Sequence, residues 1–145
     1  MRLTSTAIII ILFIAIVVIL LSGFSHYPSK IILKFYRTGG IIGEREEIIV
    51  YSDGRVSYIA EKEGISLEKK LSPDTFSELK VKVSKILPYC GETFKAKNGA
   101  ADYFTYTLEM EKCKIIWVDE WIARNPLPSE LIELQSFFKK LFEEV

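Results

Sequence analysis

The sequence predicts an α+β domain in which two helices pack on an antiparallel β-sheet. Apolar and polar residues alternate in short segments before position 71 and again between positions 103 and 118. After positions 72 and 129, apolar residues instead recur at helical spacing. The resulting order of strands, helix, strands, helix is typical of α+β domains whose helices cover one sheet.

Four strands are expected before the first helix. The first has Ile31, Leu33 and Phe35 on one face, and a loop with three glycines follows it. The second and third strands are joined at Ser52–Arg55, whose Asp-Gly pair suits a tight turn because its central residues need positive φ. A fourth, edge strand carries lysines that protect its edge. The four predicted strands cover 31–36, 46–51, 56–60 and 65–71.

The first helix is expected to begin after Ser72, which is a favourable N-cap, with Pro73 at the first helical position. Pro88 ends it. Its predicted apolar stripe consists of Phe76, Leu79, Val83, Ile86 and Leu87.

The second half of the chain predicts a loop over 89–101, a strand pair and a final helix. In the strand 103–110, the inward residues are Phe104, Tyr106, Leu108 and Met110. A tight turn at 111–112 leads to the strand 113–118, whose continuous apolar residues indicate burial on both faces. Ser129 is expected to cap the last helix, with a stripe of Leu131, Leu134, Phe138, Leu141 and Phe142.

The N-terminal segment predicts a membrane association. All 15 residues from Ala7 to Leu21 are apolar, and residues 3–24 carry no charge, which is long enough for a helix to span a bilayer. A cleaved signal peptide is the alternative, because Arg2 precedes the apolar run and small residues follow it. The predicted organisation is an anchor or signal peptide over 1–25, a short tether over 26–29 and one domain over 30–145. Retention predicts a single-pass membrane protein that contacts the lipid bilayer through residues 3–24, whereas cleavage predicts a secreted one.

Cysteine and histidine usage bears on the compartment and on metals. Cys90 and Cys113 are compatible with one disulfide in an oxidising compartment or with two thiols in a reducing one. We favour an extracytoplasmic domain. With two cysteines and the lone His26, a structural zinc site is not expected, since such sites take four ligands at paired spacing. No metal or cofactor is predicted.

Charge and motifs exclude several classes of function. The 19 basic and 19 acidic residues give a net charge of zero, which argues against nucleic-acid binding. No nucleophile elbow or phosphate-binding loop occurs, so an enzyme is not predicted. Three acids near strand ends, Asp102, Asp119 and Glu120, offer a possible carboxylate pair, although acids there usually cap loops. Trp117 and Trp121 are candidates for core packing or for contact with a partner.

The glycine-bounded loop between the first two strands is the candidate partner-binding site. Two large apolar residues lie at its centre, whereas surface loops are normally polar. They either fold back onto their own sheet or insert into a partner. The predicted site residues are Thr38, Gly39, Gly40, Ile41, Ile42, Gly43, Glu44 and Arg45.

Residues 37–45, with the strand that precedes them, resemble the Ser-Gly-Gly-Phe-Ala-Gly-x-Arg-type loop of the emfourin family, small protein inhibitors of thermolysin-like (M4) metalloproteases. Residues 102–106 are similar to the family's Asp-x-Tyr-type strand, and residues 128–131 to the Pro-x-x-Leu start of its last helix. The resemblance covers about residues 30–141. Thr38, Ile41 and Ile42 stand where the family loop has Ser, Phe and Ala, and the membrane segment is not part of the inhibitor domain.

The resemblance implies inhibition of a metalloprotease by occlusion. The loop would enter the protease cleft, with Ile41 or Ile42 in an apolar specificity pocket. The alternative function is a membrane-anchored interaction or assembly domain that shares the scaffold without inhibitory activity.

Overall fold

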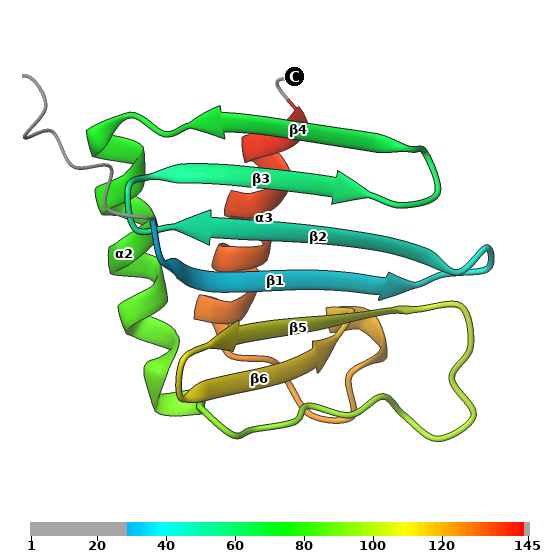
Figure 1. Cartoon of the computed structure of the whole chain (residues 1–145). Helices are drawn as coiled ribbons and strands as arrows, with labels where there is room; N and C mark the ends of the chain where they lie inside the picture. Colours follow the sequence, from blue (N-terminus) through cyan, green and yellow to red (C-terminus); the bar gives the residue numbers. More distant parts are fainter. Residues whose placement is uncertain (1–28, 144–145) are drawn as a thin grey trace, which may run out of the picture.

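The computed structural model describes residues 29–143. The predicted membrane segment 3–24 and most of the predicted tether lie outside the described residues. Within 29–143, none of the helices combines the length and apolar character that crossing a bilayer requires. The described residues form the predicted α+β fold, with two helices packed on an antiparallel sheet (Figure 1).

The described part of the chain contains a six-stranded sheet in the order β4-β3-β2-β1-β5-β6. Every neighbouring pair is antiparallel. β1 lies inside the sheet because β5 pairs with it after the chain has passed through the first helix. The strands are β1 (Ile31–Gly39), β2 (Glu44–Tyr51), β3 (Arg55–Ala60), β4 (Ile65–Lys70), β5 (Phe104–Met110) and β6 (Cys113–Val118).

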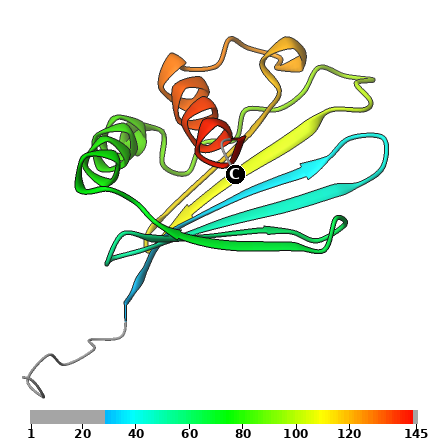
Figure 2. The ribbon, with the colours of Figure 1, turned by 90° about the horizontal axis from the view of Figure 1, so that it is seen from above.

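Two helices, α2 (Pro73–Ile86) and α3 (Ser129–Glu143), cover one face of this sheet (Figure 2). Ser72 caps α2 as predicted, since its side chain accepts a hydrogen bond from the backbone N–H of Thr75 at 3.1 Å. Short 3₁₀ turns follow α2 and β6, namely η1 (Leu87–Tyr89) and η2 (Glu120–Ile122).

Two details of the helix predictions differ from the structure, and a third falls outside the described side chains. Leu87 does not belong to the buried stripe; it lies in η1, where the chain has left the helix, and is 49% exposed. Ser129 is the first residue of α3, so it lies inside the helix rather than before it. Phe142, the last member of the predicted stripe on α3, lies outside the residues whose side chains are described.

The core lies between the helices and the sheet. Its centre is aromatic: the ring of Phe35 stacks on that of Phe138, with centroids 4.8 Å apart, and packs beside Tyr106 and Trp117. Trp117 is fully buried, and its indole N–H donates to Gln135 of α3 at 3.1 Å. The packing alternative therefore holds for Trp117. The prediction of burial on both faces of β6 holds in part, because Ile116 on the open face is half-buried.

The segment after η1 covers the outer edge of β6. Phe94 donates its backbone N–H to Ile116 at 2.8 Å, and Ile116 donates to Glu92 at 3.1 Å. Covering an edge in this way removes a surface to which another chain could pair. β4 forms the other edge of the sheet, and its lysines lie there as predicted.

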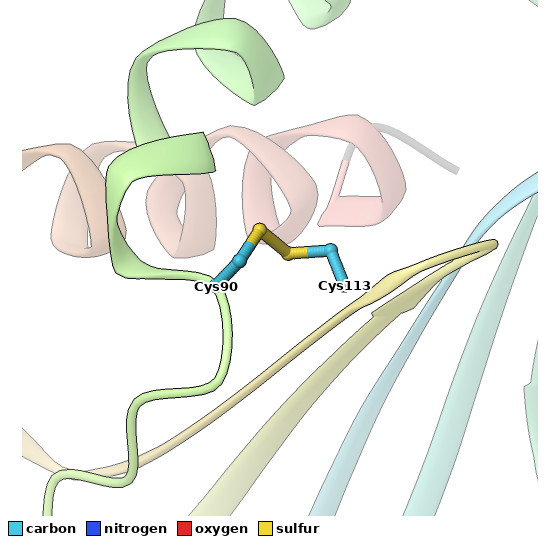
Figure 3. The surroundings of a disulfide bond; sticks show 2 residues. All are labelled: Cys90 and Cys113. Atoms are coloured by element: carbon cyan, nitrogen blue, oxygen red, sulfur yellow. A yellow bond between two sulfur atoms is a disulfide. The ribbon is translucent and has the colours of Figure 1, made fainter.

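A disulfide joins Cys90, directly after η1, to Cys113 at the start of β6 (Figure 3). The two Cα atoms are 5.0 Å apart, which lies within the normal range for a bridge. Of the two predicted states of these cysteines, the structure contains the disulfide. It fixes the end of the first helical segment to the sheet, next to the covered edge of β6.

Candidate functional site

The tip of the β1–β2 hairpin is the exposed part of the predicted loop. Only Gly40–Gly43 form the turn, because β1 continues through Gly39 and β2 begins at Glu44. Thr38, Gly39, Glu44 and Arg45 are therefore strand residues. The side chain of Ile41 is 83% exposed and that of Ile42 is 57% exposed. The two isoleucines do not fold back onto their own sheet.

Two glycines hold the turn against β5. Gly39 has φ of +128°, and a Cβ atom at this position would lie 2.4 Å from the backbone oxygen of Tyr103. Gly40 donates its backbone N–H to the same oxygen at 3.1 Å, and the ring of Phe104 packs over it. Glycine is required here both for the backbone angle and for the close approach. The base of the turn is thus fixed to a neighbouring strand.

Arg37 stabilises the hairpin from the helix side of the sheet. Its guanidinium group donates to Glu44 at 2.7 Å and to Glu46 at 2.9 Å, and lies over the ring of Phe104, 4.2 Å from the centroid. All three charged side chains are partly shielded from solvent, so these pairs are screened less than exposed ones. The side chain of Lys62, in the turn between β3 and β4, donates to the backbone oxygen of Ile42 at 3.0 Å.

The predicted site residues did not include Arg37, although its position carried a signal. It follows Leu33 and Phe35 at alternate positions of β1, so it has the parity of the core-facing residues. A cation at such a position needs partners. Two of its partners come from the adjacent strand, and the third, Phe104, comes from a strand 67 positions later in the chain.

Of the three acids considered as a carboxylate site, Asp119 has a structural role. The carboxylate of Asp119 accepts hydrogen bonds from the backbone N–H of Phe104 and from the hydroxyl of Tyr106, both at 2.8 Å. Asp119 therefore closes the end of the β5–β6 pair. Asp102, with φ of +59°, lies two residues before the start of β5, and Glu120 begins η2. Within residues 29–143, no three metal-ligating side chains come together.

Two tyrosines on the helix side of the sheet have raised pKa values. Burial, followed by the hydrogen bond to Asp119, raises the pKa of Tyr106. Burial and the nearby carboxylate of Glu46 raise the pKa of Tyr58 to about 12. Both residues keep their phenolic protons at a pH where unfolded tyrosine, with a pKa of 10.0, loses them. The stabilisation is complete below pH 10 and is lost as the pH rises through the folded-state pKa.

We expect the free energy of unfolding to fall between pH 10 and pH 12. Urea denaturation at several pH values measures this slope, because protons leave the unfolded state first. The double variant Tyr58→Phe, Tyr106→Phe should be less stable than the wild type at pH 8, owing to the lost bond to Asp119. It should also show a smaller slope above pH 10. An unchanged slope in this variant would contradict the assignment.

The helix side of the sheet also contains an apolar groove of about 810 Å³ beside α3. Its walls include Phe35, Tyr58 and Phe138, and Arg37 and Glu46 line it as well. A smaller hollow of about 440 Å³ lies between β5, β6 and the segment 93–100. Residues 38–45 line neither of them, and the three acids above are likewise absent from both linings. The hairpin tip is thus an exposed turn outside both hollows.

Comparison with known proteins does not extend these observations. No protein-family model matches the chain, and no curated protein matches it. The similarity to emfourins consequently depends on the short motifs around residues 37–45, 102–106 and 128–131.

Proposed function

We propose that this protein is a membrane-anchored interaction domain that inserts its β1–β2 hairpin tip into an apolar pocket of a partner protein. The observation that carries this proposal is the exposure of Ile41 on a turn whose base is fixed by hydrogen bonds and ion pairs. Exposing a large aliphatic side chain on a rigid turn is unfavourable in water. Its burial in a partner offsets that cost, and little conformational entropy is lost on binding because the turn is already ordered.

The resemblance to emfourins names a partner class, the thermolysin-like metalloproteases. In this mechanism the tip occupies the substrate cleft and excludes peptides from it. Ile41 is the better placed of the two isoleucines, since it is the more exposed. The fixed base of the turn keeps the bound backbone from adopting the geometry of a cleavable peptide. Inhibition then requires no chemistry from the chain itself, in agreement with the structural role of Asp119.

An interaction or assembly domain without inhibitory activity is the second candidate. The substitutions at the tip favour it, because Ile41 and Ile42 stand where the family loop has Phe and Ala. A β-branched side chain followed by a second large one has a shape different from that of a lone aromatic ring. The same hairpin would then bind a pocket of another protein.

The anchor and the compartment form part of the proposal. Residues 3–24 would hold the domain at the bilayer as a single-pass protein, and cleavage after about residue 25 would release it instead. The Cys90–Cys113 disulfide supports an extracytoplasmic domain, because disulfides persist in oxidising compartments. Mass spectrometry of the mature N-terminus distinguishes the two forms: a terminus before residue 3 indicates a retained anchor, whereas one near residue 26 indicates secretion.

Ile41→Asp is expected to weaken inhibition of thermolysin at least 100-fold. The reason is that a carboxylate would have to enter an apolar pocket without a partner. The measurement is the inhibition constant for peptide hydrolysis with the full chain in detergent. Val81→Asp is the matched control, since Val81 is also exposed, at 53%, but lies on α2. It should inhibit as the wild type does.

Three outcomes separate the candidates. Inhibition by the wild type and by Val81→Asp, with loss in Ile41→Asp, supports the inhibitor. Binding of thermolysin without slower hydrolysis supports an interaction domain. Neither binding nor inhibition by the wild type counts against a thermolysin-like partner. Circular dichroism of each variant checks the fold, and unfolding of Ile41→Asp would mean that Ile41 is a core residue.

A further inference from the structure

Besides the two isoleucines of the hairpin tip, Trp121 is a large apolar side chain that is exposed. It lies in η2, directly after β6, and is 62% exposed. The chain has one other tryptophan, Trp117, which is fully buried. The side chain of Lys97 donates to the backbone oxygen of Trp121 at 3.3 Å. The backbone N–H of Lys97 donates to the oxygen of Ile122, and the N–H of Ile122 donates to the oxygen of Asp119. The backbone of η2 is thus held in place while its indole ring faces solvent.

The strand register places η2 and the hairpin tip at one end of the sheet. Thr105 lies opposite both Thr38 and Val118, so Asp119, the residue after β6, is level with Gly39, the last residue of β1. β1 and β6 are two strand spacings apart, about 10 Å. Figure 1 shows both segments at the end toward which β1 runs, and Figure 2 shows η2 on the helix side of the tip. The segment η2, which contains Trp121, therefore lies at the same end of the sheet as the tip.

A continuous set of hydrogen bonds connects the two segments. Gly40 donates to the backbone oxygen of Tyr103, and the next residue, Phe104, donates to the side chain of Asp119. The backbone oxygen of Asp119 in turn accepts from Ile122 and from Ala123, both at 3.1 Å. Residues 103–104 and Asp119 thus form a common support for the tip and for η2. Two apolar projections on one rigid support can bind a single partner without separate ordering costs.

We infer that Trp121 is a second anchor of the interface whose first anchor is Ile41, so that one partner contacts both. This inference rests on the proposed function and names the shape of the partner: a protein with an apolar pocket for the tip and an apolar surface beside that pocket for the indole ring. A standard interface buries about 800 Å² on each partner, roughly 30 Å across, which is wide enough to reach from β1 to β6. Tryptophan is among the residues that contribute most to such interfaces.

Trp121→Ala is expected to raise the inhibition constant for thermolysin about tenfold, a smaller effect than that of Ile41→Asp. Leu87→Ala is the matched control, because Leu87 is 49% exposed but lies in η1, outside the common support of the tip and η2. It should leave inhibition unchanged. Thermal unfolding of both variants checks that the fold is retained, and Trp121→Phe, which keeps an aromatic ring, should recover part of the lost affinity.

A direct readout uses the full chain with fluorinated tryptophan. The two tryptophans give two ¹⁹F signals, which Trp121→Phe assigns. Addition of thermolysin should shift the Trp121 signal and leave that of the buried Trp117 in place, and Ile41→Asp should prevent the shift. If the wild type inhibits but the Trp121 signal and the affinity of Trp121→Ala are unchanged, the inference is wrong and the proposed function stands. If the wild type neither binds nor inhibits, both are wrong for this partner class.

Discussion

Replacing Cys90 and Cys113 together by serine is expected to lower the free energy of unfolding by about 3 kcal/mol. The bridge closes a loop with a sequence separation of 23, and a link over that distance removes conformational freedom mainly from the unfolded chain. Urea denaturation of the oxidised wild type and of the double variant measures the difference, since both retain the same core.

The position of the disulfide also predicts which residues lose local stability first when it is removed. Cys90 precedes the segment whose backbone pairs with β6, through Gly91, Glu92 and Phe94. Amide exchange at these positions should accelerate in the double variant more than exchange in β1 or β2. Reduction of the wild type by dithiothreitol should reproduce the variant's stability. A variant as stable as the oxidised wild type would show that the loop is held by its hydrogen bonds alone.

Gly39→Ala is expected to destabilise the fold by about 3 kcal/mol. A methyl group at this position would lie 2.4 Å from the backbone oxygen of Tyr103, and a backbone atom cannot move aside as a flexible side chain can. The φ of +128° adds strain for any residue with a Cβ atom. Relief requires β1 and β5 to separate at this end. Thermal unfolding measures the loss, and the hairpin tip should lose its fixed base.

Gly43→Ala provides the matched control for Gly39→Ala. Gly43 is the last residue of the turn that follows Gly39, and its φ is +66°, but a Cβ atom there would meet nothing within 4 Å. Its cost should be limited to the left-handed backbone, about 1 kcal/mol. Equal losses in the two variants would mean that backbone angle, rather than the contact with Tyr103, determines the requirement for glycine. The larger loss in Gly39→Ala is therefore the informative result.

The sequence predicts the elements of this fold better than their arrangement. Alternation and capping residues are local signals, and they suffice for the six strands and for the start of α2 at Pro73. The position of β1 inside the sheet was not predictable in this way, because β5 reaches it from about 70 residues further along the chain. The covering of β6 by residues 92–94 was likewise predicted only as a loop, since no periodic pattern marks a single chain that follows a strand edge.

The candidate site was likewise predictable in its local pattern but not in its tertiary contacts. Three glycines around two isoleucines indicated the turn, but they did not show whether the isoleucines face the sheet or solvent. That outcome depends on Tyr103 and Phe104, which fix the base of the turn from β5. The exposure of Trp121 depends in the same way on the turn that follows Asp119. Such contacts are set by tertiary packing, which a local pattern does not contain.

In the proposed membrane-anchored form, β1 leads from the anchored start of the domain to the hairpin tip. β1 begins at Ile31, next to the point where the described chain starts, and runs in one direction to Gly39 (Figure 1). At about 3.3 Å per residue this strand spans roughly 26 Å. With residues 3–24 in the membrane, Ile41 would contact its partner about one length of β1 away from the start of the domain. A tethered partner would need its pocket at a matching height above the lipid surface, whereas a freely diffusing one would not.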